Sequence, residues 1–107
     1  MDAVTALAGS GPAFVYAMIE ALAHGGEKMG LTKQSALRLA AQTALGASDL
    51  MIASEKSPAD LIKMVVTPGG TTAAGLRVMD ERAIAGAIAD AVKAATERSK
   101  EMARENL

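Results

Sequence analysis

The chain has 107 residues, of which 50% are hydrophobic and 2% aromatic, with a formal net charge of −1 and no cysteine. A charge balance this close to zero argues against a nucleic-acid-binding protein, which shows a basic stripe, and against electrostatic attachment to a membrane surface. The lack of cysteine excludes a disulfide framework, a thiol nucleophile and a cysteine metal site, and it fits a cytoplasmic protein.

The length of the chain predicts one domain over residues 1–107. No uninterrupted run of about 18 apolar residues is present, so we expect no transmembrane helix. The N-terminal segment has no basic stretch before its apolar part, so we expect no signal peptide.

Helical patterns fill the chain, and no segment shows the alternation of a half-buried strand, which predicts an all-α protein. A short helix or turn is expected over residues 2–7. The following "GSGPAF" predicts a helix start, with Ser10 as N-cap and Pro12 in the first turn, where its missing N–H costs nothing. We expect this helix to run to about residue 29 and to end at Gly30.

Four more helices are expected along the rest of the chain. The second long helix should run from Thr32 to about Ala53, with a face of small residues that permits close helix contact. Ser57 as N-cap and Pro58 at the first position predict a short helix to about residue 66. Helix should resume near residue 71 and end near residue 80, and an amphipathic helix should cover residues 82–106.

The loop "TPGGTT", residues 67–72, is the segment best suited to chemistry. Gly69 and Gly70 stand directly before a helix, whose free N–H groups and positive dipole end favour a carboxylate or phosphate. Thr67, Thr71 and Thr72 add hydroxyls that donate or accept. The same composition also fits a plain connector with a threonine cap, and the loop alone does not decide between the two interpretations.

Other reactive side chains give weaker signals. His24 is the only histidine and has no cysteine partner, so we expect a surface or packing role and no metal site. Glu55, taken alone, is expected to be a solvated carboxylate. No serine has a recognisable base, which leaves no nucleophilic triad. The seven methionines suit core or interface packing.

Several segments, in this order and over nearly the whole chain, resemble the helical domain of the pyrroline-5-carboxylate reductase family, which completes proline biosynthesis. The segments are "DAVTALAGSGPAFVYAMIEALAHGGEKMGL", "LAAQTALGASDLM", "SPADLIKMVVTPGGTTAAGLRVMDE" and "AIADAVKAATERSKEM". The resemblance implies an interlocking multi-helix bundle, of the type seen in the C-terminal part of 6-phosphogluconate dehydrogenase, that forms a homodimer or a multiple of dimers. It also implies an oxidoreductase. From the charge balance and the lack of cysteine we expect it to be cytoplasmic, with no nucleic-acid or membrane partner.

The family reaction is hydride transfer from NADPH or NADH to the C=N carbon of a small cyclic imino acid, which gives proline. Family enzymes carry the cofactor on an N-terminal Rossmann domain, and no such domain appears in these residues. We therefore expect the chain alone to bind no cofactor and to be inactive.

The resemblance also implies roles for individual residues. Gly70, Thr71 and Thr72, in the same loop as Thr67 and Gly69, match residues that hold the substrate carboxylate. Thr72 also matches a hydroxyl near the ring nitrogen, which makes it the candidate proton donor, and Glu55 matches a glutamate near that nitrogen. Ser10, Gly11 and Pro12 match a helix start that faces the nicotinamide. Val66 and Thr67 stand where the family usually has Thr-Ser.

Two other functions remain open from the sequence. The alanine-rich faces and the missing nucleotide domain also fit a freestanding helical homo-oligomer module without a catalytic role. A related imine or hydroxy-acid reductase with a similar helical half is the third possibility.

Overall fold

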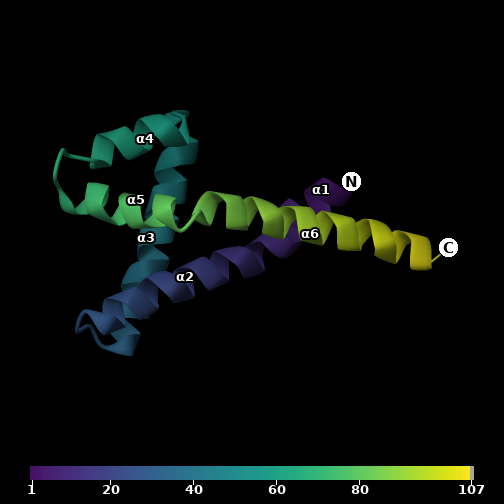
Figure 1. Cartoon of the computed structure of the whole chain (residues 1–107), viewed down its shortest axis with the longest axis horizontal. Coiled ribbons are helices and arrows are strands. Elements are labelled where there is room, and N and C mark those ends of the chain that lie inside the picture. Colours follow the sequence, from purple (N-terminus) through teal and green to yellow (C-terminus); the bar gives the residue numbers. More distant parts are fainter. Residues whose placement is uncertain (107) are drawn as a thin grey trace. The chain divides into compact units, whose positions relative to one another are not determined.

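The computed structural model describes residues 1–106, which form helices and connecting turns (Figure 1). No strand occurs in that range, which confirms the all-α prediction. The elements are α1 (Asp2–Val4), the π-helix η1 (Thr5–Ser10), α2 (Gly11–Lys28), α3 (Lys33–Ser54), α4 (Pro58–Val65), α5 (Thr71–Glu81) and α6 (Ile84–Glu105).

The chain forms two compact units. One consists of Met1–Phe14 together with the chain from Pro68 onward, and the other is Val15–Thr67. The long helix that begins at Asp2 passes from the first unit into the second.

In the first unit, α6 packs against the N-terminal segment and against α5. It contacts α1, η1 and α5, and Figure 1 shows its C-terminal half beside α1. The Ser99 hydroxyl donates to Oδ1 of Asp2 over 2.8 Å, a bond between residues 97 positions apart. Ala6 is completely buried. Its small side chain allows close approach of the two helices.

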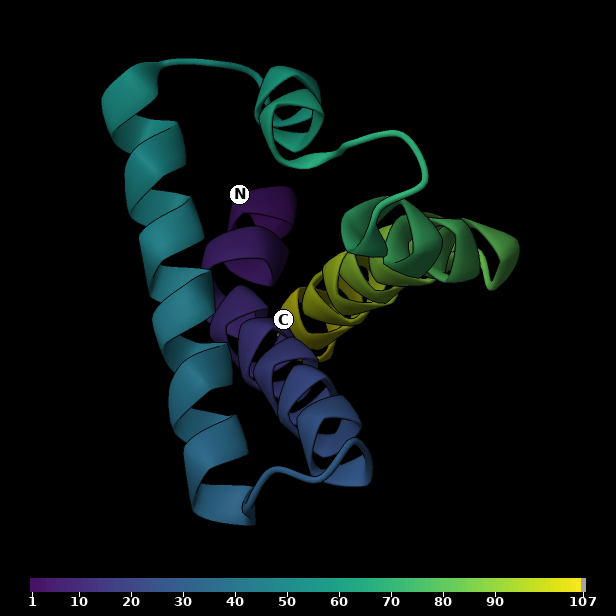
Figure 2. The same cartoon turned by 90° about the vertical axis from the view of Figure 1, so that its left-hand side faces the viewer.

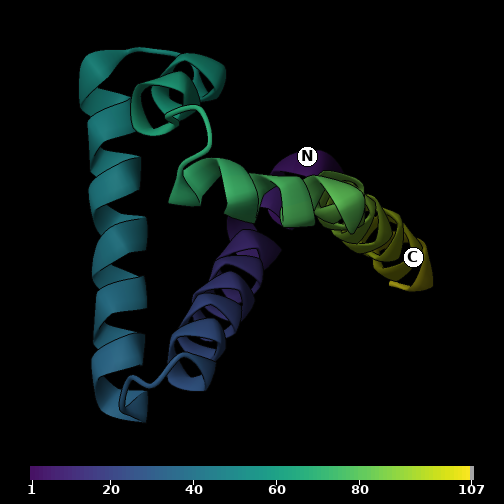
Figure 3. The same ribbon diagram turned by 60° about the vertical axis from the view of Figure 1, so that its left-hand side comes forward.

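In the second unit, α2 and α3 form a hairpin. The turn that joins them lies at the bottom of Figure 2, and the two helices diverge from it in Figures 1 and 3. The core near the turn consists of Ala23, Ala36 and Ala40, with Ile19 packed against them. Thr32 caps α3, because its hydroxyl accepts from the Ser35 N–H over 3.2 Å. The predicted start of this helix is confirmed.

The predicted cap of α4 is confirmed as well. Ser57 is the N-cap, its hydroxyl accepts from the Asp60 N–H over 3.1 Å, and Pro58 occupies the first turn. Proline has no backbone N–H. In the first turn an N–H would have no partner within the helix, so Pro58 costs the helix no hydrogen bond.

The predicted helix start at Ser10 is wrong. The helix runs unbroken from Asp2 to Lys28, and Ser10 lies inside it as the last residue of the π-helix. The flanking segments are rich in alanine and leucine, which favour helix on both sides. Pro12 therefore falls in a helix interior, where a widened turn comes just before it.

The helix Asp2–Lys28 is long and apolar enough, by length and composition alone, to cross a membrane. Our expectation of no such helix rested on the lack of an unbroken apolar run, and it does not hold by this measure. Most of the helix is exposed within the single chain.

Candidate functional site

The start of α5 has the geometry of an anion site. Gly69 adopts a positive φ of 72°, which glycine tolerates and other residues rarely adopt. Gly70 is the N-cap, with φ −85° and ψ −178°, and its carbonyl accepts from the Ala74 N–H over 3.2 Å. The first N–H groups of a helix have no partner within it.

No side chain caps α5 in the part of the chain that the structure describes. The threonine cap of the connector interpretation is therefore absent. Thr71 is exposed and Thr72 half-buried, and the segment from Val66 to Ala74 carries no charged side chain. Thus no carboxylate on this loop competes with an anion for the N–H groups of the first turn.

Glu55 and Thr67 belong to the other unit, Val15–Thr67. Glu55 is the C-cap of α3, with φ 58° and ψ 14°, and its side chain is exposed. A non-glycine residue in this left-handed conformation is uncommon, and such strain concentrates at functional sites. Thr67 is exposed and follows Val66, the extended C-cap of α4.

Ser10, Gly11 and Pro12 lie together where the π-helix meets α2. Ser10 is half-buried, and Gly11 has helical angles of φ −51° and ψ −41°. A cavity of about 250 Å³ opens between η1 and α6, and Ser10 forms part of its wall. The other lining residues are Thr5, Ala95, Arg98, Ser99 and Met102.

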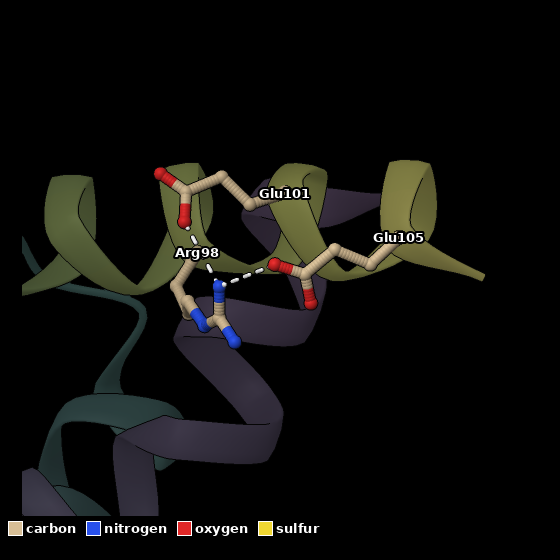
Figure 4. A network of polar contacts seen from close by, with 3 residues as sticks. All are labelled: Arg98, Glu101 and Glu105. Atoms are coloured by element: carbon tan, nitrogen blue, oxygen red, sulfur yellow. Dashed lines mark hydrogen bonds and ion pairs between the residues drawn. The ribbon is translucent and has the colours of Figure 1, made fainter. Parts of the chain in front are cut away.

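Arg98 in this wall is already held by two carboxylates of its own helix. One nitrogen, Nη1, donates to Oε2 of Glu101 over 3.0 Å and to Oε1 of Glu105 over 3.1 Å (Figure 4). These hydrogen bonds raise the pKa of Arg98 above its ordinary value. All three side chains are more than half exposed, so solvent screens the attraction.

A second cavity, of about 490 Å³, lies between α2 and α3 in the unit Val15–Thr67. Glu20, His24, Glu27 and Lys33 contribute to its wall. Sequence reasoning treated His24 alone and missed this group, although the spacing of four and three residues along α2 places the first three on one helix face. Within residues 1–106, no three His, Cys, Asp or Glu side chains lie close enough to hold a metal ion.

Residues 1–102 match a protein-family model described as pyrroline-5-carboxylate reductase dimerisation. A pyrroline-5-carboxylate reductase of Synechocystis is 48% identical over 104 residues, which are 97% of this chain and 39% of that protein. The corresponding enzyme of Methanosarcina acetivorans is 47% identical over 104 residues, or 97% of this chain and 38% of its own length. The chain thus spans well under half of these relatives.

Two solved structures of reductases also superpose closely on this chain. The NADP-bound pyrroline carboxylate reductase of Plasmodium falciparum superposes with a TM-score of 0.91 at 38% identity, covering 95% of this chain and 39% of that one. The reductase of Streptococcus pyogenes gives a TM-score of 0.91 at 39% identity, over 94% of this chain and 39% of its own. Because the family match extends over almost every residue, the chain belongs to the pyrroline-5-carboxylate reductase dimerisation family.

Proposed function

We propose that this chain is the dimerisation and substrate-binding domain, over residues 1–107, of an enzyme that reduces 1-pyrroline-5-carboxylate to L-proline with a nicotinamide cofactor. The observation that carries the proposal is the start of α5, which follows Gly69 and Gly70 and has no side-chain cap. The family match of the chain gives this loop its functional context.

A homodimer, or a multiple of dimers, is supported by the large apolar surface of the chain. Only four residues in the described part are buried, and all four are alanines. Large side chains stay outside in both units, among them Leu7 (67% exposed), Leu39 (55%), Ile52 (74%) and Val78 (51%). Covering one such side chain contributes about 1.5–3 kcal/mol. A second copy that interlocks with the first would cover many of them, and obligate dimers of this kind often have no stable monomer.

The substrate carboxylate is proposed to bind at the start of α5. The N–H groups of Gly70, Thr71 and Thr72 would donate to it, and the helix dipole favours its charge. Thr67 and Gly69 complete the loop. The ring nitrogen would then lie near the Thr72 hydroxyl, which would pass a proton to it directly or through a water molecule and would itself be reprotonated from solvent. Glu55 would stabilise the positive charge of the protonated imine.

A nicotinamide cofactor, NADPH or NADH, supplies the hydride that reduces the C=N carbon. From this chain, Ser10, Gly11 and Pro12 are proposed to face the nicotinamide. Their fit rests on the half-buried Ser10 hydroxyl, a suitable partner for a carboxamide, and on Gly11, which leaves open space beside the helix. We propose that a dinucleotide-binding domain holds the rest of the cofactor and that the enzyme is cytoplasmic.

The test is a chimera. The N-terminal part of the Synechocystis reductase, which this chain does not match, is fused to residues 1–107, and imine-dependent NADPH oxidation is measured. Thr72→Ser should keep most of the activity. Thr72→Val, which has nearly the same shape but no hydroxyl, should lower kcat about 10²-fold or more, the usual size of a general-acid contribution.

A dimeric, folded chimera without activity would contradict the catalytic proposal. It would instead favour the freestanding helical module, which has the same exposed apolar faces and needs no substrate loop. Activity unchanged in Thr72→Val would leave the enzyme intact and remove Thr72 as the donor.

A further inference from the structure

Pro12 creates a problem that the fold has to solve. It lies inside the unbroken helix Asp2–Lys28. Proline has no N–H to offer the carbonyl four residues earlier, here Ala8, and its ring collides with that carbonyl in a regular α-helix. Proline also disfavours helical angles at the residue before it, through a clash with the side chain of that residue.

Two local features relieve these conflicts. The residue before Pro12 is Gly11, which has no Cβ and keeps helical angles of φ −51° and ψ −41°. The segment Thr5–Ser10, immediately upstream, is a π-helix, whose wider turn bonds each carbonyl to the N–H five residues on.

The π-helix has a consequence for the cavity between η1 and α6. Thr5 and Ser10 both line this cavity, although they are five residues apart. In an α-helix of 3.6 residues per turn, such residues point about 140° apart, on different sides. In the wider turn of a π-helix, five residues make only a little more than one turn, so Thr5 and Ser10 point to the same side. The Asp2–Ser99 hydrogen bond fixes the rotation of the same segment against α6.

We propose that Pro12 is a positioning residue that fixes the π-helix and thereby holds Ser10 beside Thr5 on the wall that faces α6. This proposal rests on the proposed function, in which Ser10 meets the nicotinamide. Besides lying in the segment that faces the nicotinamide, Pro12 acts through the backbone on Ser10, whose hydroxyl makes the polar contact. Bulges of the π type are common at functional sites, where they re-aim a side chain at some cost in stability.

The substitution Pro12→Ala tests the proposal. It restores an N–H that bonds the Ala8 carbonyl, so residues 5–10 should become α-helical and the segment 2–10 should rotate by about 100°, one residue of helix. Scalar couplings across hydrogen bonds, measured by NMR on the 107-residue chain, identify the acceptor of each amide. The amides of residues 9 and 10 should shift from acceptors five residues back to acceptors four back. Pro58→Ala, at the start of α4, is the control and should change none of them.

Activity is measured in the chimera. Pro12→Ala should lower kcat/KM for NADPH on the order of 10²-fold, as expected for a misplaced contact group. The KM for the imine should stay within about twofold, since the substrate loop is unchanged. Ser10→Ala should lower kcat/KM for NADPH while leaving the π-helix acceptors as they are.

Each outcome of these experiments tests a different part of the proposal. If the five-residue acceptors persist in Pro12→Ala, Pro12 does not set the π-helix and the proposal is overturned. If they change and kcat/KM for NADPH does not, the positioning role is overturned. A parent chimera without activity would refute the proposed function and the positioning role with it, whereas the couplings would still decide what Pro12 does to the backbone.

Discussion

The loop before α5 gives the sharpest stability prediction, because one substitution made at two glycines should have opposite effects. Gly69→Ala places a Cβ in open space, with no atom within 4 Å. Its whole effect therefore comes from the backbone, which holds φ at 72°. An L-residue in this conformation costs about 1–2 kcal/mol. Gly25→Ala, in α2, also meets nothing within 4 Å but has an ordinary helical backbone. It should stabilise the chain by about 0.5–1 kcal/mol.

Urea unfolding at one fixed protomer concentration measures both variants, because the stability of a dimer depends on concentration. The midpoint should fall for Gly69→Ala and rise for Gly25→Ala, with the slope unchanged. In the chimera, Gly69→Ala should also raise the KM for the imine, since relief of the strain turns the following N–H groups away from the carboxylate. Equal shifts of the two midpoints would refute the reasoning, because they would mean that the backbone angle at Gly69 has no energetic role.

Three further substitutions test a helix cap, a backbone angle and two surface ion pairs. Ser57→Ala loses the hydrogen bond from the Asp60 N–H and should lower the stability by about 1 kcal/mol, with Ser57→Asp restoring it; an unchanged midpoint would mean that solvent replaces the cap. Glu55→Gly should gain about 1 kcal/mol by relieving φ 58° and yet reduce turnover of the chimera, whereas full turnover would exclude the carboxylate from the site. Arg98→Ala should leave the urea midpoint unchanged, because its ion pairs are exposed; a clear loss would show that they act as a network.

Much of the fold follows from local signals in the sequence. Ser57 and Pro58 mark the start of α4, and Thr32 marks the start of α3, because a cap needs only residues within one turn of each other. The break before α5 follows from Pro68 and the two glycines after it. In each case the stable local structure depends on residues that are close together in the sequence, so it can be predicted from the sequence alone.

The predictions were wrong where the structure depends on distant residues or on local changes that compensate for one another. The start at Ser10 was predicted from the proline, but helix-forming residues on both sides and a π-turn absorbed it. The positive φ values of Glu55 and Ala83 have no local signal, since neither residue favours that conformation. The last helix consequently begins at Ile84, after Ala83, and not at Arg82.

The candidate site also contains some residues that the sequence reveals and others that it does not. The glycines and threonines of residues 67–72 could be chosen from the sequence, because an anion site at a helix start is built from consecutive residues. The side-by-side placement of Thr5 and Ser10 could not, because it depends on a helix type that no residue pattern announces. The group of Glu20, His24 and Glu27 could have been found from its spacing along α2.

The central claim, that this chain assembles with a second copy through its apolar faces, is tested most directly by its mass in solution. Light scattering across a concentration series, from low to high micromolar, should give at least twice the protomer mass of 10.9 kDa throughout. A folded monomer at every concentration would contradict the account. Monomers that bind phospholipid vesicles would contradict it too and would assign the exposed face of Asp2–Lys28 to lipid.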